Sequence, residues 1–234
     1  MNRLSLAFLS CLFVNAGVSA DEPQFHWDRA TLTLIASGDA ARGQAIAKEH
    51  KCKKCHGKTG VSDEDDTPSI AGQVPSYLFK QLMDYKSGLR EEKTMTKRAR
   101  KLTREQMADL AAFYAMQKPE EAVMQQAPKL VTEGDLNRLL LPCNVCHGKH
   151  GEGLGFEVPA LAGQKIEHFV ETLEAFQESD RENDQYGRMR FIAQQLTEDE
   201  ITELAAYYSA PPSMDEDEDR DEDGDEDDDD EDEK

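Results

Sequence analysis

The sequence predicts an all-α protein built from two tandem copies of one unit. Apolar residues recur at helical spacing, no segment alternates polar and apolar residues as a strand would, and the region 38–214 repeats itself. Adding 91 to the numbers of Cys52–Gln73 gives a close match at Cys143–Gln164, and after three inserted residues the offset becomes 94. The repeat therefore predicts one domain over 38–128 and a second over 129–214.

Three helices are expected in the first copy. Residues 39–50 form an alanine-rich segment, and residues 75–87 carry apolar side chains at helical spacing with a proline in the first turn. The last helix is expected to open at Thr103, because Thr103 and Gln106 have the pattern of a capping box. It should end before Pro119, since proline cannot continue a helix.

The second copy predicts matching helices at corresponding places. Residues 133–141 and 166–177 occupy the positions of the first two helices. Thr197 and Glu200 repeat the capping box, and the helix that they open should stop before Pro211.

Both ends of the chain differ in composition from the repeat. Residues 1–20 resemble a secretory signal peptide with a basic start, an apolar run too short to span a bilayer and small residues before Asp21. The mature protein is therefore expected to be soluble and exported. Residues 21–37 form an N-terminal extension without an assigned role. Residues 215–234 include 17 acidic residues and are expected to be a disordered acidic tail.

Two Cys-x-x-Cys-His segments, Cys52–His56 and Cys143–His147, carry the chemistry. This spacing is typical of c-type haem attachment, because two thiols can add to the two vinyl groups of one porphyrin while the adjacent imidazole ligates the iron. The sequence thus predicts two covalently bound haem c groups. The attachment residues would be Cys52, Cys55, Cys143 and Cys146, with His56 and His147 as axial iron ligands.

Zinc sites and disulfides are the alternative uses of four cysteines in an exported protein. Neither explains why a histidine directly follows both cysteine pairs. The fifth cysteine, Cys11, lies in the expected signal peptide, so two haems use every remaining thiol. Covalent haem attachment takes place outside the cytoplasmic membrane, so export and haem binding together indicate a bacterial periplasm.

A methionine is expected as the second axial ligand of each iron. After His147 the sequence has two methionines, Met189 and Met214, and Met214 lies beyond Pro211 and Pro212, outside the matching segments. At the offset of 94 Met189 matches Met95. Both are expected in a loop just before the last helix. Three other methionines of the first copy are expected to fill the core: Met83, Met107 and Met116. Four histidines are expected to have surface or structural roles: His26, His50, His150 and His168.

The sequence resembles the dihaem class I cytochromes c, close to the cytochrome c4 group. The resemblance rests on both haem motifs, both axial methionines, the closing helices, and the matching segments Pro68–Gln73 and Pro159–Gln164. It implies two class I cytochrome c domains related by pseudo-twofold symmetry, with the haem propionates of the two domains near each other. It also implies that a carbonyl at Pro68 and at Pro159 orients each histidine, and that electrons pass between respiratory complexes and a terminal oxidase or reductase.

Ligation by histidine and methionine saturates the iron, which predicts a one-electron carrier and not an enzyme. An alternative is the dihaem cytochrome subunit of a larger dehydrogenase, such as a flavocytochrome that oxidises sulfide. A haem enzyme is less favoured: a peroxidase needs an opening axial site, and a thiosulfate dehydrogenase uses a cysteine ligand for which no cysteine remains.

Charge is distributed unevenly between the halves. Residues 38–128 contain 16 basic and 13 acidic residues, whereas 129–214 contain 7 basic and 15 acidic residues. Basic residues surround the first haem motif and Met95. This basic cluster is either a solvated face or a docking surface for a partner. We expect an acidic redox partner at the first domain and a basic one at the second domain or the tail, which itself could cover the basic face. No nucleic-acid partner and no transmembrane segment are expected, although the protein could associate with membrane respiratory complexes.

Overall fold

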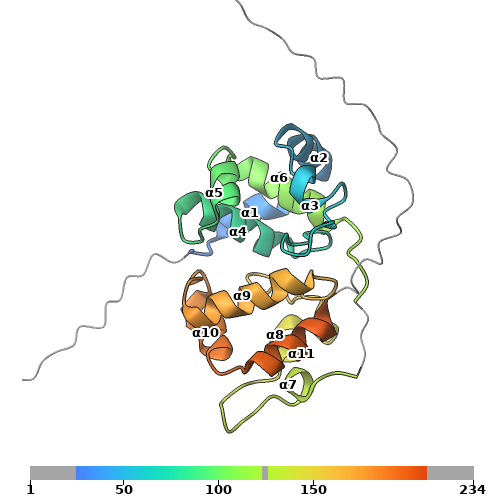
Figure 1. Cartoon of the computed structure of the whole chain (residues 1–234). Helices are drawn as coiled ribbons and strands as arrows, with labels where there is room; N and C mark the ends of the chain where they lie inside the picture. The colour runs from blue at the N-terminus through green and yellow to red at the C-terminus, as the bar shows by residue number, and fades with distance from the viewer. Residues whose placement is uncertain (1–24, 123–125, 210–234) are drawn as a thin grey trace, which may run out of the picture.

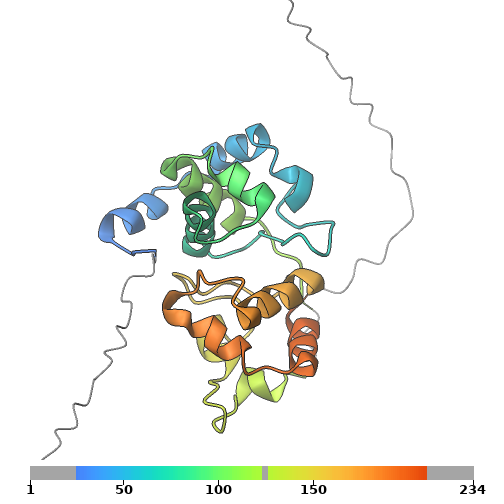
Figure 2. The same cartoon turned by 60° about the vertical axis from the view of Figure 1, so that its left-hand side comes forward.

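The computed structural model describes residues 25–122 and 126–209, which form two helical bodies stacked on each other (Figures 1 and 2). The first body contains α1 (Arg29–Ala36), α2 (Ala40–Glu49), α3 (Lys53–His56), α4 (Pro75–Ser87), α5 (Lys93–Ala99) and α6 (Arg104–Ala115). The second contains α7 (Lys129–Thr132), α8 (Cys143–His147), α9 (Ile166–Glu178), the 3₁₀ turn η1 (Gln185–Gly187), α10 (Arg188–Ala193) and α11 (Glu198–Tyr208). Within these residues there is no strand, only three isolated bridges. The predicted all-α fold class is confirmed.

The last helix of each body starts with the predicted capping box. The Thr103 hydroxyl accepts from the N–H of Gln106, whose side chain accepts from the N–H of Thr103. Thr197 and Glu200 make the same two bonds at α11. These bonds satisfy two N–H groups that have no partner inside the helix, so they define where each helix begins.

Each body has its own apolar core. In the first, α2 packs closely on α6 at Gly43, where an added Cβ would lie 2.0 Å from the carbonyl oxygen of Asp109. The contact is closed by the Asp109 carboxylate, which pairs with Arg42 and accepts from the N–H of Asp39. In the second body α9, α10 and α11 pack together around Phe169, Leu173, Leu196, Ile201 and Leu204.

The helix predicted over 133–141 is wrong. Helix α7 ends at Thr132, and Asp135 and Leu140 close a tight turn by exchanging backbone hydrogen bonds of 2.9 and 2.8 Å. Gly134 has a φ of 69°, a conformation that interrupts a helix. Arg138 binds Asp135 within the turn and reaches Glu200 of α11, so tertiary contacts overrode the local helical pattern.

Met95 and Met189 lie on short helices rather than in the predicted loops. Met95 is on α5 and Met189 is on α10. Helix α5 forms because the Glu92 carboxylate accepts from the N–H groups of Thr94 and Met95 and so caps the first turn.

The N-terminal extension belongs to the first body as far as it is described. Helix α1 is capped by Asp28 and packs on α4 and α6. The predicted signal peptide and acidic tail lie outside the described residues. Among those that are described, no helix is long and apolar enough to cross a membrane.

Candidate haem centres

Both Cys-x-x-Cys-His segments form one short helical turn that stops immediately after the histidine. The stop is made by Gly57 in the first body and Gly148 in the second, with φ values of 71° and 86°. A Cβ at Gly57 would lie 1.7 Å from the carbonyl oxygen of Val61, so only glycine lets the chain turn away there. The turn leaves each histidine buried at the end of its helix.

The two histidines are buried in the same environment. The Nδ1 atom of His56 lies 2.9 Å from the carbonyl oxygen of Pro68, and that of His147 lies 3.1 Å from the carbonyl oxygen of Pro159. Because a carbonyl only accepts, Nδ1 must carry the proton and Nε2 keeps its lone pair. Burial lowers the pKa of both imidazoles, although the carbonyl contact opposes this shift. Each imidazole is therefore held in a fixed orientation that leaves Nε2 available as a donor.

In each haem motif, one cysteine thiol is half-buried and the other is exposed. Cys52 and Cys143 are half-buried against the two cores, whereas Cys55 and Cys146 are exposed, and all four are free. Burial raises the pKa of Cys52, and it raises that of Cys143 to about 11. No three His, Cys, Asp or Glu side chains converge as a metal site in the part of the chain that is described.

The methionines predicted as ligands are half-buried against the same cores as the thiols. Met95 and Cys52 both contact the first core, and Met189 and Cys143 both contact the second. Met107 is fully buried in the core and Met83 lies partly buried against it, as expected. Met116 is 76% exposed just beyond the end of α6, so the expectation that it fills the core is wrong.

The other histidines do not share the environment of His56. His26 and His150 are exposed, and His50 is half-buried at the end of α2. His168 lies on α9, and its backbone N–H donates to the carbonyl of Asp65 in the other body. Burial and the nearby charges of Arg90 and Arg181 lower its pKa to about 3, so its imidazole is neutral.

The two bodies are joined by a reciprocal pair of glutamines. The Gln73 carboxamide accepts from the N–H of Ala160 at 2.7 Å and donates to its carbonyl at 3.0 Å. Gln164 makes the same two bonds to Ser69, at 2.9 and 3.0 Å. Gln73 and Gln164 are 91 residues apart, and so are Ser69 and Ala160. The two sets of bonds are therefore related by the pseudo-twofold symmetry of the repeat. Sequence matching found both glutamines but assigned them no role.

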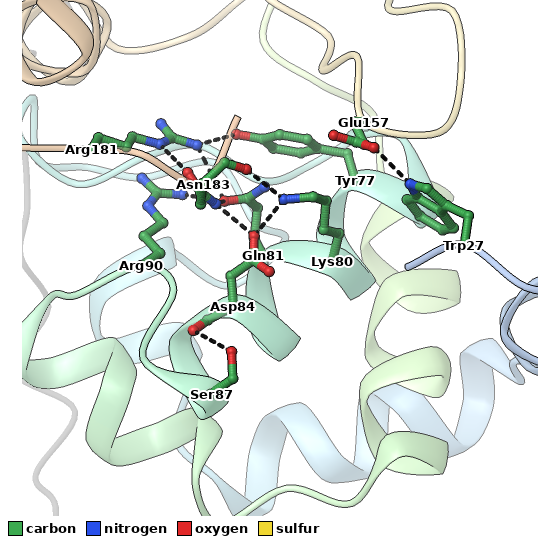
Figure 3. A network of polar contacts seen from close by, with 10 residues as sticks. All are labelled: Trp27, Tyr77, Lys80, Gln81, Asp84, Ser87, Arg90, Glu157, Arg181 and Asn183. Carbon is green, nitrogen blue, oxygen red and sulfur yellow. Dashed lines mark hydrogen bonds and ion pairs between the residues drawn. The ribbon is translucent and has the colours of Figure 1, made fainter. Parts of the chain in front are cut away.

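A buried polar network joins α4 to the segment after α9 (Figure 3). The Lys80 ammonium pairs with Asp84 at 2.6 Å and donates to the carbonyl of Asn183, and the Asn183 amide donates to Asp84. Arg181 and the Asn183 amide both donate to the Gln81 carboxamide. Sequence reasoning missed this network, although Arg90 and Arg181 also match at the offset of 91.

The N-terminal extension contributes a separate contact between the bodies. The Trp27 indole N–H donates to Glu157 at 2.7 Å (Figure 3). The Trp27 ring also packs edge-on against Phe156. The Ser76 hydroxyl donates to the carbonyl of Phe156. The extension therefore helps to hold the second body against the first.

The residues of both centres fit a covalently bound haem. Each centre has two free thiols at the required spacing and a buried imidazole whose Nε2 is available, and a thioether packs against the same core. Two thiols that can add to the porphyrin, together with an imidazole and a soft thioether as axial donors, are the groups that a six-coordinate haem c requires.

Comparisons with known proteins place this chain among cytochromes c. The cytochrome c family model matches residues 40–115. A cytochrome c4 of Pseudomonas aeruginosa is 36% identical over 183 residues, which cover 74% of this chain and 88% of that protein. A thiosulfate dehydrogenase electron acceptor of Stutzerimonas stutzeri is 32% identical and covers 79% and 94%. The crystal structure of reduced cytochrome c4 from Pseudomonas stutzeri has a TM-score of 0.70 at 31% identity and covers 74% and 99%.

Proposed function

The chain belongs to the cytochrome c4 family of dihaem electron-transfer proteins, and from this premise we propose how its two haem centres work. The first iron is held by His56 and Met95, and the second by His147 and Met189. Cys52 and Cys55 bind the first haem, and the corresponding thiols of the second motif bind the other. Bound in this way, each haem supplies reversible one-electron chemistry.

The observation that carries the proposal is the equivalence of the two histidines. In both centres a backbone carbonyl fixes Nδ1 as the protonated nitrogen, so both histidines have the same tautomer and Nε2 would be free to bind an iron. A thioether and an imidazole together leave no vacant axial position, so neither iron can bind a substrate. The protein therefore carries electrons and catalyses no reaction of its own.

A potentiometric titration of the purified full chain tests this function. We expect two one-electron transitions per chain and no binding of carbon monoxide by the reduced protein, because both irons are saturated. A single transition, or a haem that binds carbon monoxide, would contradict the proposal for that centre.

A second candidate function is to accept electrons from a thiosulfate dehydrogenase. The similarity to the thiosulfate dehydrogenase electron acceptor of Stutzerimonas stutzeri favours this function, because the matched region covers 94% of that protein. Association with a sulfide-oxidising flavocytochrome stays a prediction. Reduction rates with purified thiosulfate dehydrogenase and with a sulfide-oxidising flavoprotein as donors separate the two. Saturable reduction by one and none by the other identifies the donor class.

The two haem-attachment faces offer different surfaces to partners. Around the first motif five lysines are exposed: Lys48, Lys51, Lys53, Lys54 and Lys58. At the corresponding positions of the second body the exposed side chains include Leu139 and Val145, which match Lys48 and Lys54. We propose that the first face docks an acidic redox partner and that the second domain meets a different partner. We also propose that the protein is exported to the periplasm, where these partners would meet it.

A further inference from the structure

The three extra residues of the second domain lie directly before its proposed iron ligand, Met189. Arg90 and Arg181 still match at the offset of 91, whereas Met95 and Met189 match at 94. The insertion therefore falls within residues 182–188. The segments that lead to the two methionines differ, although the methionines themselves occupy equivalent places in the repeat.

In the first domain the methionine is held by a simple helix cap. The Glu92 carboxylate accepts from the backbone N–H of Thr94 at 2.8 Å and from that of Met95 at 2.6 Å. Glu92 is exposed and directly precedes α5. Met95 is therefore fixed by a local contact at the protein surface.

In the second domain the chain reaches α10 through a strained turn. Tyr186 has a φ of 59°, and Gly187, the residue before α10, has a φ of 65°. This region of backbone conformation is unfavourable for a bulky side chain. Tyr186 is 78% exposed, so packing of its ring does not account for the conformation. Strain of this kind persists only where surrounding contacts fix the backbone.

The contacts that fix the turn come from Asp184. Its side chain is only 4% exposed, and its carboxylate accepts from the backbone N–H of Arg190 at 3.0 Å and from the Arg190 Nε at 2.8 Å. The Arg190 guanidinium also pairs with Glu182 at 3.0 Å. Tyr186 and Gly187 lie between Asp184 and Arg190 in the chain, so this ion pair closes a loop around the strained turn.

The ion pair acts on the residue next to the methionine. Arg190 directly follows Met189, and one carboxylate binds both its backbone and its side chain. The peptide between Met189 and Arg190 therefore cannot rotate without breaking these bonds. At the offset of 94 Arg190 matches Thr96, which cannot form an ion pair, so the first domain has no equivalent of this contact.

We propose that Asp184, acting through Arg190, holds Met189 in position to ligate the second iron. The inference rests on the proposed function, because it takes Met189 as the axial ligand. Asp184 and Arg190 are positioning residues: the turn stores strain that opposes the bound position of Met189, and the ion pair offsets that strain. Ligation of the second iron therefore depends on a shielded ion pair, whereas Met95 depends on an exposed cap.

The substitution D184A in the haem-loaded full chain tests this inference. We expect the oxidised second haem to bind added imidazole about tenfold more tightly, because imidazole then competes with a methionine that has lost charge-assisted hydrogen bonds. The potential of one transition should fall, since thioether ligation raises it, and the other should keep its value. In an M95A background the remaining methionine-to-iron band reports the second centre alone.

Asp180 provides the matched control, because it is an exposed carboxylate shortly after α9. D180A should leave imidazole binding and both potentials unchanged. D184N keeps one acceptor oxygen without the charge, and R190K keeps the charge without the Nε donor. Both should therefore fall between the parent and D184A, and they carry the test if D184A does not mature.

Imidazole affinities and potentials that match the parent in D184A, D184N and R190K would overturn the inference. Equal changes at both haems would also overturn it, since they would report a general loss of stability and not a displaced Met189. If M189A in the parent chain keeps the methionine-to-iron bands of both haems, Met189 is not a ligand. That result would reject the proposed ligation itself, so the two failures are distinguishable.

Discussion

The side chain of Gln164 in the second domain accepts from the backbone N–H of Ser69 in the first domain and donates to the Ser69 carbonyl. Ser69 directly follows Pro68, whose carbonyl oxygen fixes the ring of His56. Gln73 does the same to Ala160, which follows Pro159. Each domain therefore supports the loop that orients the proximal histidine of the other, so the interface and the two haem centres form one unit.

Removing these glutamines should loosen the interface. Q73A and Q164A each delete the two hydrogen bonds that cross the interface and a third to the N–H of the following residue. Because buried backbone groups then lose their partners, each variant should lower the free energy of unfolding by about 1–3 kcal/mol. Denaturant unfolding measures this change. Q44A, at an exposed position of α2, is the matched control and should have little effect. Equal stability of Q73A and Q44A would show that the reciprocal bonds do not hold the domains together.

Substituting the axial methionines should open one centre at a time. M95A and M189A should each remove about half of the methionine-to-iron charge-transfer band of the oxidised protein and let the reduced haem bind carbon monoxide. M116A, at an exposed methionine, should change neither property. If M95A keeps the full band, the sixth ligand of the first iron is another side chain.

Acid should weaken the second domain through the ion pair of Glu200 and Arg138. Arg138 lowers the pKa of Glu200 to about 2, and both side chains are partly shielded from water. Since the pKa is lower in the folded state, the pair stabilises the fold above the ordinary glutamate pKa of about 4.3 and loses this effect as pH falls toward 2.

The contribution at neutral pH should be about 1–2 kcal/mol once solvent screening is allowed for. Unfolding of the full chain between pH 2 and 6 measures it. E200Q should flatten the dependence in this range, whereas E203Q, at an exposed position on the same helix, should not. A parent and an E200Q variant with the same pH profile would exclude this role.

The acidic tail should slow the docking of acidic partners if it covers the basic face. Deleting residues 215–234 removes 17 acidic side chains, so the on-rate of an acidic redox partner should rise at low salt. The difference should vanish at high salt, where exposed charges are screened. Stopped-flow reduction across a salt series measures both regimes. Rates that are identical at every ionic strength would mean that the tail does not compete for this surface.

The parts of the fold that follow local rules were predictable from the sequence. The capping boxes at Thr103 and Thr197 locate two helices correctly, because each box needs only residues three apart. Helix α4 coincides with its predicted range, since Pro75 and the left-handed Gly88 bound it. The haem motifs and the repeat together indicated the cofactor and the number of domains.

The parts that depend on tertiary contacts were not predictable. The segment 133–141 has a helical pattern, but Gly134 and the bonds of Arg138 to α11 make it a turn. The role of Gln73 appears only when Ala160 is placed beside it. Likewise, the convergence of Arg90 and Arg181 on the Gln81 side chain appears only once the two bodies are placed together.

The near-infrared spectrum of the oxidised full chain, with haem quantified per chain, tests the central claim most directly. Two haems per chain that both show the methionine-to-ferric-iron band would agree with ligation by His56 and Met95 in one centre and His147 and Met189 in the other. One haem per chain, or a haem without that band, would contradict the account of a saturated two-centre electron carrier.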